Sequence, residues 1–215
     1  MRYSVNRIHL TRLAVLAFVL LVGCSNGFDV PIAETTTPQR DSTPACGLQC
    51  ANADLRGIYL RVGESTSYLF ADFRFANLSG ATLRGVFIGA DFETVNLSGA
   101  DLSTATFIDS YFDGADLTGT NFANTGLRNT TLSNARLIDA NLSGSRIENS
   151  SLFGANLEGA NLEGAYIRCI SFDRSNLRGA IFKGAEISSS SFEEIIGDTP
   201  PNEPMRAMND CDSED

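Results

Sequence analysis

Between residues 92 and 192 an apolar side chain recurs at every fifth position, and this spacing constrains the fold more than any other feature. All 21 of these positions hold Leu, Ile or Phe, and at 19 of them the residue two places earlier is Ala, Ser or Thr. An α-helix has a period of 3.6 residues and a β-strand a period of 2, so neither produces a period of five. The spacing therefore predicts a repeat architecture in which each unit is stabilised by stacking on its neighbours.

The repeats carry a recognisable motif. Residues 115–119 (ADLTG) and 160–164 (ANLEG) resemble the pentapeptide-repeat family, whose consensus is A-(D/N)-L-x-x. The resemblance covers about residues 51–196 and implies an all-β fold, a right-handed quadrilateral β-helix of about six coils with flexible N- and C-terminal segments. It also implies that four pentapeptides form one square coil, with the central apolar residue and the small residue two places before it pointing inward. Coils would stack at about the 4.7–4.9 Å spacing of neighbouring strands.

Two irregularities interrupt the repeat near its N-terminal end. Residues 61–69 (RVGESTSYL) break the pattern and are predicted to form a loop. Nine residues rather than ten separate Leu83 from Phe92, so one residue is missing from the grid. We expect residues 86–88 to absorb that slip as a short corner or a distorted face.

The N-terminus has the pattern of an export signal. Residues 1–12 contain three arginines and no acid, and residues 13–22 are an unbroken apolar run. That run is shorter than the roughly 20 residues needed to span a bilayer core, as in a secretory signal peptide. It ends in LVGC, which resembles the bacterial lipobox and implies a signal peptide at residues 1–23 and a diacylglycerol on Cys24. Several acyl chains would attach the protein durably to a membrane. The alternative is an ordinary signal peptide with a chance cysteine.

This signal predicts a location in the cell envelope, lipid-anchored on the periplasmic side. Ser25 follows the lipobox cysteine, where an Asp would indicate retention at the inner membrane, so outer-membrane sorting is the default expectation. Cleavage after residue 23 would remove three arginines and no acid, and the formal charge would change from −10 to −13.

Cleavage would also remove His9, the one histidine. Without imidazole the mature protein has no Ser-His-Asp or Cys-His catalysis and no His-ligated metal site. The sequence has no P-loop, G-x-S-x-G or Gly-rich dinucleotide turn. We therefore expect no enzyme activity, no cofactor and no metal. The acidic charge argues against binding to a nucleic-acid backbone.

Composition also divides the chain. All six prolines lie in residues 25–45 and 197–215, and none lies in the repeats, where proline would remove ladder donors. The predicted organisation is a lipidated cysteine and flexible linker at residues 24–50, the repeat body at 51–196 and an acidic tail at 197–215. Four cysteines remain after lipidation, and export permits disulfides. The expected pairs join Cys46 to Cys50 and Cys169 to Cys211; the alternative is four free or intermolecular thiols.

Residues 20 apart should stack on one face of the coil. One face is the most acidic, and another carries a column of asparagines at positions 121, 141 and 161. The fourth face carries charges of alternating sign. Outward apolar side chains are expected at Ile108, Ile138, Phe153 and Ile181. The candidate interaction surface, for which the alternative is a solvated structural ladder, comprises Arg128, Arg146, Glu148, Phe153, Tyr166 and Arg168.

Three functions compete at this stage. The first is an envelope-anchored, non-catalytic scaffold that presents its faces to an unknown envelope protein or glycan. The second follows from the family resemblance, since some cytoplasmic pentapeptide-repeat proteins mimic DNA and bind a topoisomerase such as gyrase; an export signal disfavours it. The third, an enzyme, is disfavoured by the missing histidine and by a filled interior.

Overall fold

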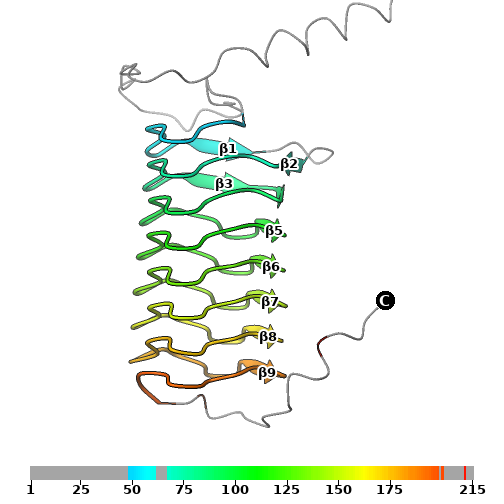
Figure 1. The fold of residues 1–215 in the computed structure, drawn as a ribbon, viewed down its shortest axis with the longest axis vertical. Helices are drawn as coiled ribbons and strands as arrows, with labels where there is room; N and C mark the ends of the chain where they lie inside the picture. The colour runs from blue at the N-terminus through cyan, green and yellow to red at the C-terminus, as the bar shows by residue number, and fades with distance from the viewer. Residues whose placement is uncertain (1–47, 62–66, 199, 201–210, 212–215) are drawn as a thin grey trace, which may run out of the picture.

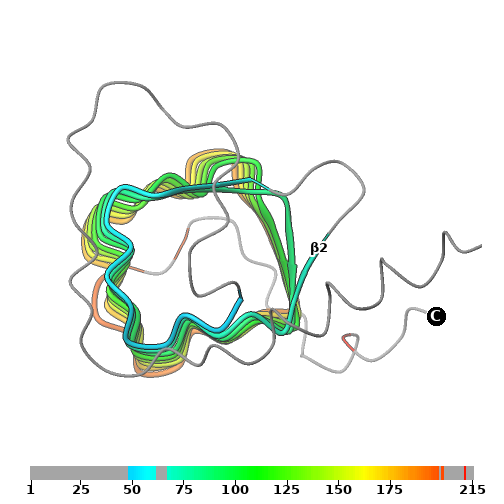
Figure 2. The same cartoon turned by 90° about the horizontal axis from the view of Figure 1, so that it is seen from above.

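The five-residue period is one side of a square coil, and the coils stack along a single axis (Figures 1 and 2). The computed structural model describes residues 48–61, 67–198, 200 and 211, and contains no helix among them. Of the 21 apolar repeat positions, 20 are buried and Ile187 is partly buried. The all-β, right-handed quadrilateral β-helix of about six coils is confirmed.

We number the four faces by their inward-pointing residues in one coil. Face one contains Phe92, face two Leu97, face three Leu102 and face four Phe107, and all four side chains are buried. Each side takes five residues, so after four sides the chain returns to its starting face, one strand spacing further along the axis. Residues 20 apart therefore lie next to each other and pair in parallel. Phe107 and Leu127 are one such pair.

Face four of each coil is a short extended strand. Seven strands form one parallel sheet in the order β2-β4-β5-β6-β7-β8-β9, and β1 pairs with β3 in a separate two-stranded sheet. The remaining faces pair through isolated bridges. The strands are β1 (Tyr59–Arg61), β2 (Ser67–Leu69), β3 (Thr82–Arg84), β4 (Val86–Ile88), β5 (Thr106–Ile108), β6 (Gly126–Arg128), β7 (Arg146–Glu148), β8 (Tyr166–Arg168) and β9 (Glu186–Ser188).

Hydrogen bonds between coils satisfy the backbone throughout the body. The amide of Leu97 donates to the carbonyl of Asp116 (2.8 Å), and the amide of Asn121 donates to the carbonyl of Ala100 (2.9 Å). Corner residues take left-handed backbone angles, such as Gly119 (φ 64°) and Asn124 (φ 56°). Glycine and asparagine accept this region with the least strain, which explains their recurrence at the fifth place.

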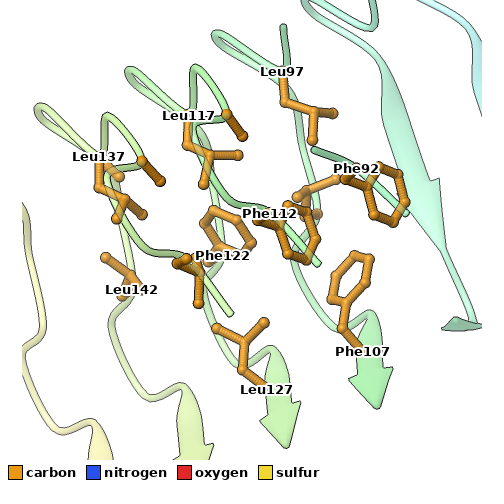
Figure 3. Close-up of a cluster of buried hydrophobic side chains, with 14 of the residues drawn as sticks. Phe92, Leu97, Phe107, Phe112, Leu117, Phe122, Leu127, Leu137 and Leu142 are labelled. Atoms are coloured by element: carbon orange, nitrogen blue, oxygen red, sulfur yellow. The ribbon is translucent and has the colours of Figure 1, made fainter. Parts of the chain in front are cut away.

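Aromatic rings stack in columns inside the coil because equivalent residues lie directly above one another. Phe92 stacks on Phe112 with ring centroids 4.7 Å apart, and Phe87 stacks on Phe107 at 5.0 Å. Edge-to-face contacts join the two columns, as between Phe107 and Phe112 at 5.1 Å. Further along the axis Leu127, Leu137 and Leu142 occupy the interior (Figure 3). Such ring pairs add to the stabilisation from burial alone.

The first coil differs from the prediction at both of its ends. It includes residues 48–50, which the sequence analysis assigned to the linker: Gln49 bridges Asp72, and Cys50 is fully buried. The interval predicted as a loop, residues 61–69, contains β2, and Tyr68 fills an interior position by stacking on Phe87 at 4.6 Å. Residues 62–66 lie outside the described part of the chain.

The sequence predicted that residues 86–88 absorb the missing residue, but the structure places the shortened corner at Gly85. Those residues form a regular strand, β4, whose register with β5 is the usual 20 residues, from Val86 to Thr106. The short corner is Gly85 alone, at φ 110°. A side chain bearing a Cβ would rarely adopt that angle, so glycine permits a corner one residue shorter than the others.

Removing one of the stacked aromatic rings should destabilise the β-helix. We expect Phe112→Ala to lower the free energy of unfolding by about 3–5 kcal/mol, because the fully buried ring contacts Phe92, Phe107 and Phe122 and its loss leaves a cavity. Urea denaturation followed by circular dichroism measures the change. Ile181→Ala, at a position 48% exposed, is the control and should lie within about 1 kcal/mol of the wild type. Equal effects at the two positions would contradict the packing described.

Candidate functional site

The outer surface of face four carries most of the residues predicted to form an interaction surface. Strands β6, β7 and β8 place Arg128, Glu148 and Arg168 in one outward row, and Arg146 and Tyr166 in the parallel row beside it. The strands are in register, so these five side chains occupy one flat patch of the sheet. The sequence period alone was enough to bring them together.

Arg128, Glu148 and Arg168 alternate in charge sign along the column as predicted, and Glu148 also has a partner on its own strand. Arg146 donates to both carboxylate oxygens of Glu148, at 2.9 and 2.7 Å, although the two residues lie on the same strand. The Arg146 guanidinium also lies over the Tyr166 ring, with Cζ 4.6 Å from its centroid. Residues two apart on a strand point to the same side, so the bidentate geometry of arginine favours this neighbour. Glu148 is therefore fixed by Arg146, while Arg128 is exposed.

Phe153 does not belong to that patch. It follows Leu152 on face one, where its ring is 39% exposed and lies beneath the Arg174 guanidinium, with Cζ 5.5 Å from the ring centroid. Arg174 in turn pairs with Glu194 at 2.9 Å. Phe153 therefore lies one face away from the other five residues of the predicted interaction surface, because its centre at Leu152 belongs to face one.

Near the N-terminal end the outer surface of face four is apolar, and the sequence analysis missed most of it. Leu69, Ile88 and Ile108 pair in one outward row across β2, β4 and β5. Only Ile108 was predicted to point outward, because residues 61–69 were interpreted as a loop. The signal was present in Tyr68, which lies 19 residues before Phe87 and continues the face-four column across the short coil.

Partly buried carboxylates on face one are held by hydrogen bonds between coils. Asp113 accepts from the amide of Ser133 at 2.8 Å, and Asp173 accepts from the amide of Glu193 at 2.7 Å. Asp173 also accepts from the Ser191 hydroxyl at 3.0 Å. These acids brace successive coils and do not converge on a substrate position.

Three of the charged pairs, at Asp54, Asp72 and Asp101, shift the pKa of the carboxylate downward. Hydrogen bonds from Arg74 (3.0 and 2.8 Å) lower the pKa of Asp72 and raise that of the arginine. At Asp101 burial raises the pKa, but hydrogen bonds from Arg84 and Ser103 outweigh it and the net direction is down. A general acid at neutral pH needs the opposite shift, so these carboxylates are structural.

The predicted asparagine column forms in part. Asn141 Nδ2 donates to Asn121 Oδ1 at 3.2 Å, and Asn121 donates onward to Asp101 Oδ1 at 3.1 Å. Asn161 Oδ1 accepts from the amide of Glu163 at 3.0 Å. A second column on face two was not predicted: Asn176 donates to Asn156 Oδ1 at 3.0 Å. These ladders add hydrogen bonds parallel to the axis of the rod.

A disulfide joins the body to the C-terminal tail. Cys169, at a corner of face four, is bonded to Cys211, with Cα atoms 5.6 Å apart, which is the pairing put forward from the sequence. Pro200 is also buried, so ordered contacts extend beyond the predicted body end at residue 196. Cys50 is disulfide-bonded as well, and its predicted partner Cys46 lies outside the described residues, as does Cys24.

Chemical sites are not evident in the described part of the chain. Residues 48–61, 67–198, 200 and 211 contain no group of three or more His, Cys, Asp or Glu placed to hold a metal ion. Among the same residues no helix has the length and apolar character needed to cross a membrane. The candidate functional site is therefore the outer surface of the β-helix.

Comparison with known families decides the relationship. A family profile described as "Pentapeptide repeat region" matches residues 84–162, and one described as "Pentapeptide repeats (8 copies)" matches residues 155–193. Together they span just over half of the 215 residues. The chain belongs to the pentapeptide-repeat family. No curated protein matches the sequence.

Several solved pentapeptide-repeat and related structures are similar to this chain. HetL, a pentapeptide repeat protein of the cyanobacterium Nostoc sp. strain PCC 7120 involved in heterocyst differentiation regulation, is 20% identical, covers 69% of this chain and 87% of its own, and has a TM-score of 0.32. QnrB1, a plasmid-mediated fluoroquinolone resistance protein, is 19% identical over 70% and 87%, with a TM-score of 0.33. Rfr23 of the cyanobacterium Cyanothece 51142 is 26% identical over 70% and 92%, with a TM-score of 0.24.

Removing the tail disulfide should weaken the C-terminal coils. We expect Cys211→Ser to lower the free energy of unfolding by about 2–4 kcal/mol, because the cross-link closes a segment of 42 residues in the unfolded chain. Guanidinium denaturation without reductant measures the loss. The double variant Cys169→Ser/Cys211→Ser is the matched control and should behave like the single variant. A single variant as stable as the wild type would show that the bond does not form in solution.

Proposed function

We propose that this pentapeptide-repeat protein is a lipid-anchored, non-catalytic scaffold of the cell envelope. A lipid on Cys24 holds the protein at the membrane, and the rigid β-helix presents its outer faces to an envelope protein or glycan. The observation that carries the proposal is the division between a filled interior and a patterned exterior on a chain that begins with a lipobox.

The filled interior supports a role in binding rather than catalysis. Rings and aliphatic side chains fill the square from Phe73 to Phe192 in a single continuous cluster. Enzyme sites are usually concave, with polar groups that converge on a bound molecule. Here the charged groups lie outside and many pair with their own neighbours along the rod, as Lys183 does with Glu163 at 3.1 Å.

The flat outer surface of face four is the best-ordered place for a partner. Its side chains are fixed by the sheet, and the Arg146–Glu148–Tyr166 group combines an aromatic ring, an ion pair and a cation–π contact. Tyrosine and arginine are the residue types that contribute most often to binding hot spots. Loops are not needed to position them, so a partner would meet a pre-organised surface.

The DNA-mimic alternative is disfavoured by charge density as well as by the export signal. Residues 67–196 carry 15 acidic and nine basic side chains, a net charge of −6. A duplex of about 30 Å, roughly the length of six coils, carries about 18 phosphate charges. The rod therefore has about a third of the charge of the duplex it would imitate, and several of its carboxylates are engaged by arginines.

Lipidation tests the proposal directly. We expect the full chain expressed in a bacterium to incorporate radiolabelled palmitate and to sediment with the membranes, since a lipobox cysteine becomes the acylated N-terminus. Cys24→Ala should abolish both. Cys211→Ser, which removes a cysteine elsewhere, is the control and should label like the wild type. A wild-type chain that takes up no label would contradict the envelope function.

A further inference from the structure

The most exposed large apolar side chains lie together near one end of the rod. Leu69, Phe70 and Phe75 are 52%, 71% and 61% exposed, and no other large apolar side chain in the described residues exceeds the 48% of Ile181. Leu69 is the last residue of β2, Phe70 follows it at the corner, and Phe75 lies between β2 and β3. We call these three residues the N-terminal apolar patch.

Two residues of the patch occupy backbone positions that aromatic residues rarely adopt. Phe70 (φ 51°) and Phe75 (φ 58°) lie at corners, where most other coils place Gly, Asn or Asp. A bulky side chain is unfavourable in the left-handed region. The Phe70 ring lies against Gly89 of the next coil, but both rings remain more than half exposed and gain little from burial. Strain and exposure at the same residues indicate a contact made outside the chain.

The chain that leads from Cys24 enters the rod between these two rings. The amide of Asp72 donates to the carbonyl of Leu48 at 2.7 Å, and the amide of Cys50 donates to the carbonyl of Asp72 at 2.7 Å. Asp72 lies on face one, between the corners occupied by Phe70 and Phe75. The linker therefore joins the β-helix on the side and at the end that carry the apolar patch.

The linker also keeps the patch close to the anchor. Residues 24–48 would span about 80 Å if fully extended, and about 27 Å on average as a flexible coil. A lipid on Cys24 thus holds Phe70 and Phe75 within a few tens of ångströms of the bilayer. Such tethering raises the local concentration of lipid, so a contact too weak to bind by itself becomes effective.

The distribution of charge along the rod favours an orientation with the N-terminal end toward the membrane. Residues 48–84 carry four arginines and three carboxylates, whereas residues 85–196 carry seven basic and 14 acidic side chains. An anionic lipid surface would attract the first segment and repel the second. Three side chains also expose far less than the roughly 1,000 Å² that a specific protein interface needs, which favours lipid over a protein partner.

We propose that Leu69, Phe70 and Phe75 seat the N-terminal end of the β-helix in the headgroup region of the bilayer that holds Cys24. The rings enter the apolar boundary beneath the headgroups, and the acidic remainder of the rod projects away from the surface. This inference rests on the lipid anchor proposed above and adds to it a second, non-covalent membrane contact.

The absence of tryptophan from the sequence provides a clean probe. Phe70→Trp and Phe75→Trp each introduce one fluorophore into the patch, and Phe153→Trp places one at a 39% exposed position far along the rod. The full-length mature lipoprotein of each variant is reconstituted into vesicles of phosphatidylethanolamine and phosphatidylglycerol with brominated acyl chains. We expect blue-shifted emission and strong quenching for the two patch variants, and neither for Phe153→Trp.

The possible results distinguish membrane contact by the apolar patch from lipidation of Cys24. Palmitate labelling of the same preparations reports lipidation. Labelled protein whose patch variants are no more quenched than Phe153→Trp overturns the seating and leaves the anchor intact, whereas unlabelled protein overturns both. Phe70→Asn added to Phe75→Trp should reduce quenching while the far-UV circular dichroism stays unchanged, because asparagine tolerates the positive φ. Undiminished quenching in that double variant would also overturn the proposal.

Discussion

The narrow interior of the square coil is the constraint on which the rest of this structure depends. Each side has room for one large apolar residue and one small residue, and both must recur at a fixed spacing or the backbone of the next coil cannot pair. Phe92 and Phe112 stack in register for this reason, and Ala and Ser occupy the neighbouring inward places. The charged side chains are then directed outward, while small hydroxyl residues such as Ser110 and Thr120 remain inside, so the same period that builds the core also arranges the surface in rows.

Much of the fold could be predicted from the sequence because the period is local and uninterrupted after Phe92. The pattern identified the inward residues, the asparagine pair Asn121–Asn141 and the neighbours on face four. It failed where the grid is broken. Tyr68 fills a core position inside an interval that looked like a loop, and the missing residue falls at Gly85, because only a glycine reaches the backbone angle of a shortened corner.

The candidate site was less predictable than the fold, and the reason is geometric. A repeat gives the position of each Cα but not the choice among several reachable partners. Glu148 has arginines above and below it in the column, and it also accepts two hydrogen bonds from Arg146 on its own strand, where a bidentate arrangement is available. The place of Phe153 after Leu152 follows from the repeat, but its contact with the Arg174 guanidinium does not. Side-chain contacts of this kind need coordinates.

The disulfides at the two ends of the rod have a mechanical consequence. A stack in which each coil contacts only its neighbours separates most readily from its ends, one coil at a time, when tension is applied along the chain. Cys50, in the first coil, is disulfide-bonded, and Cys169–Cys211 ties the tail to the region of the last coils. Tension applied through the proposed lipid anchor would first reach the coil that contains Cys50, and the coils beyond it would separate only after that one.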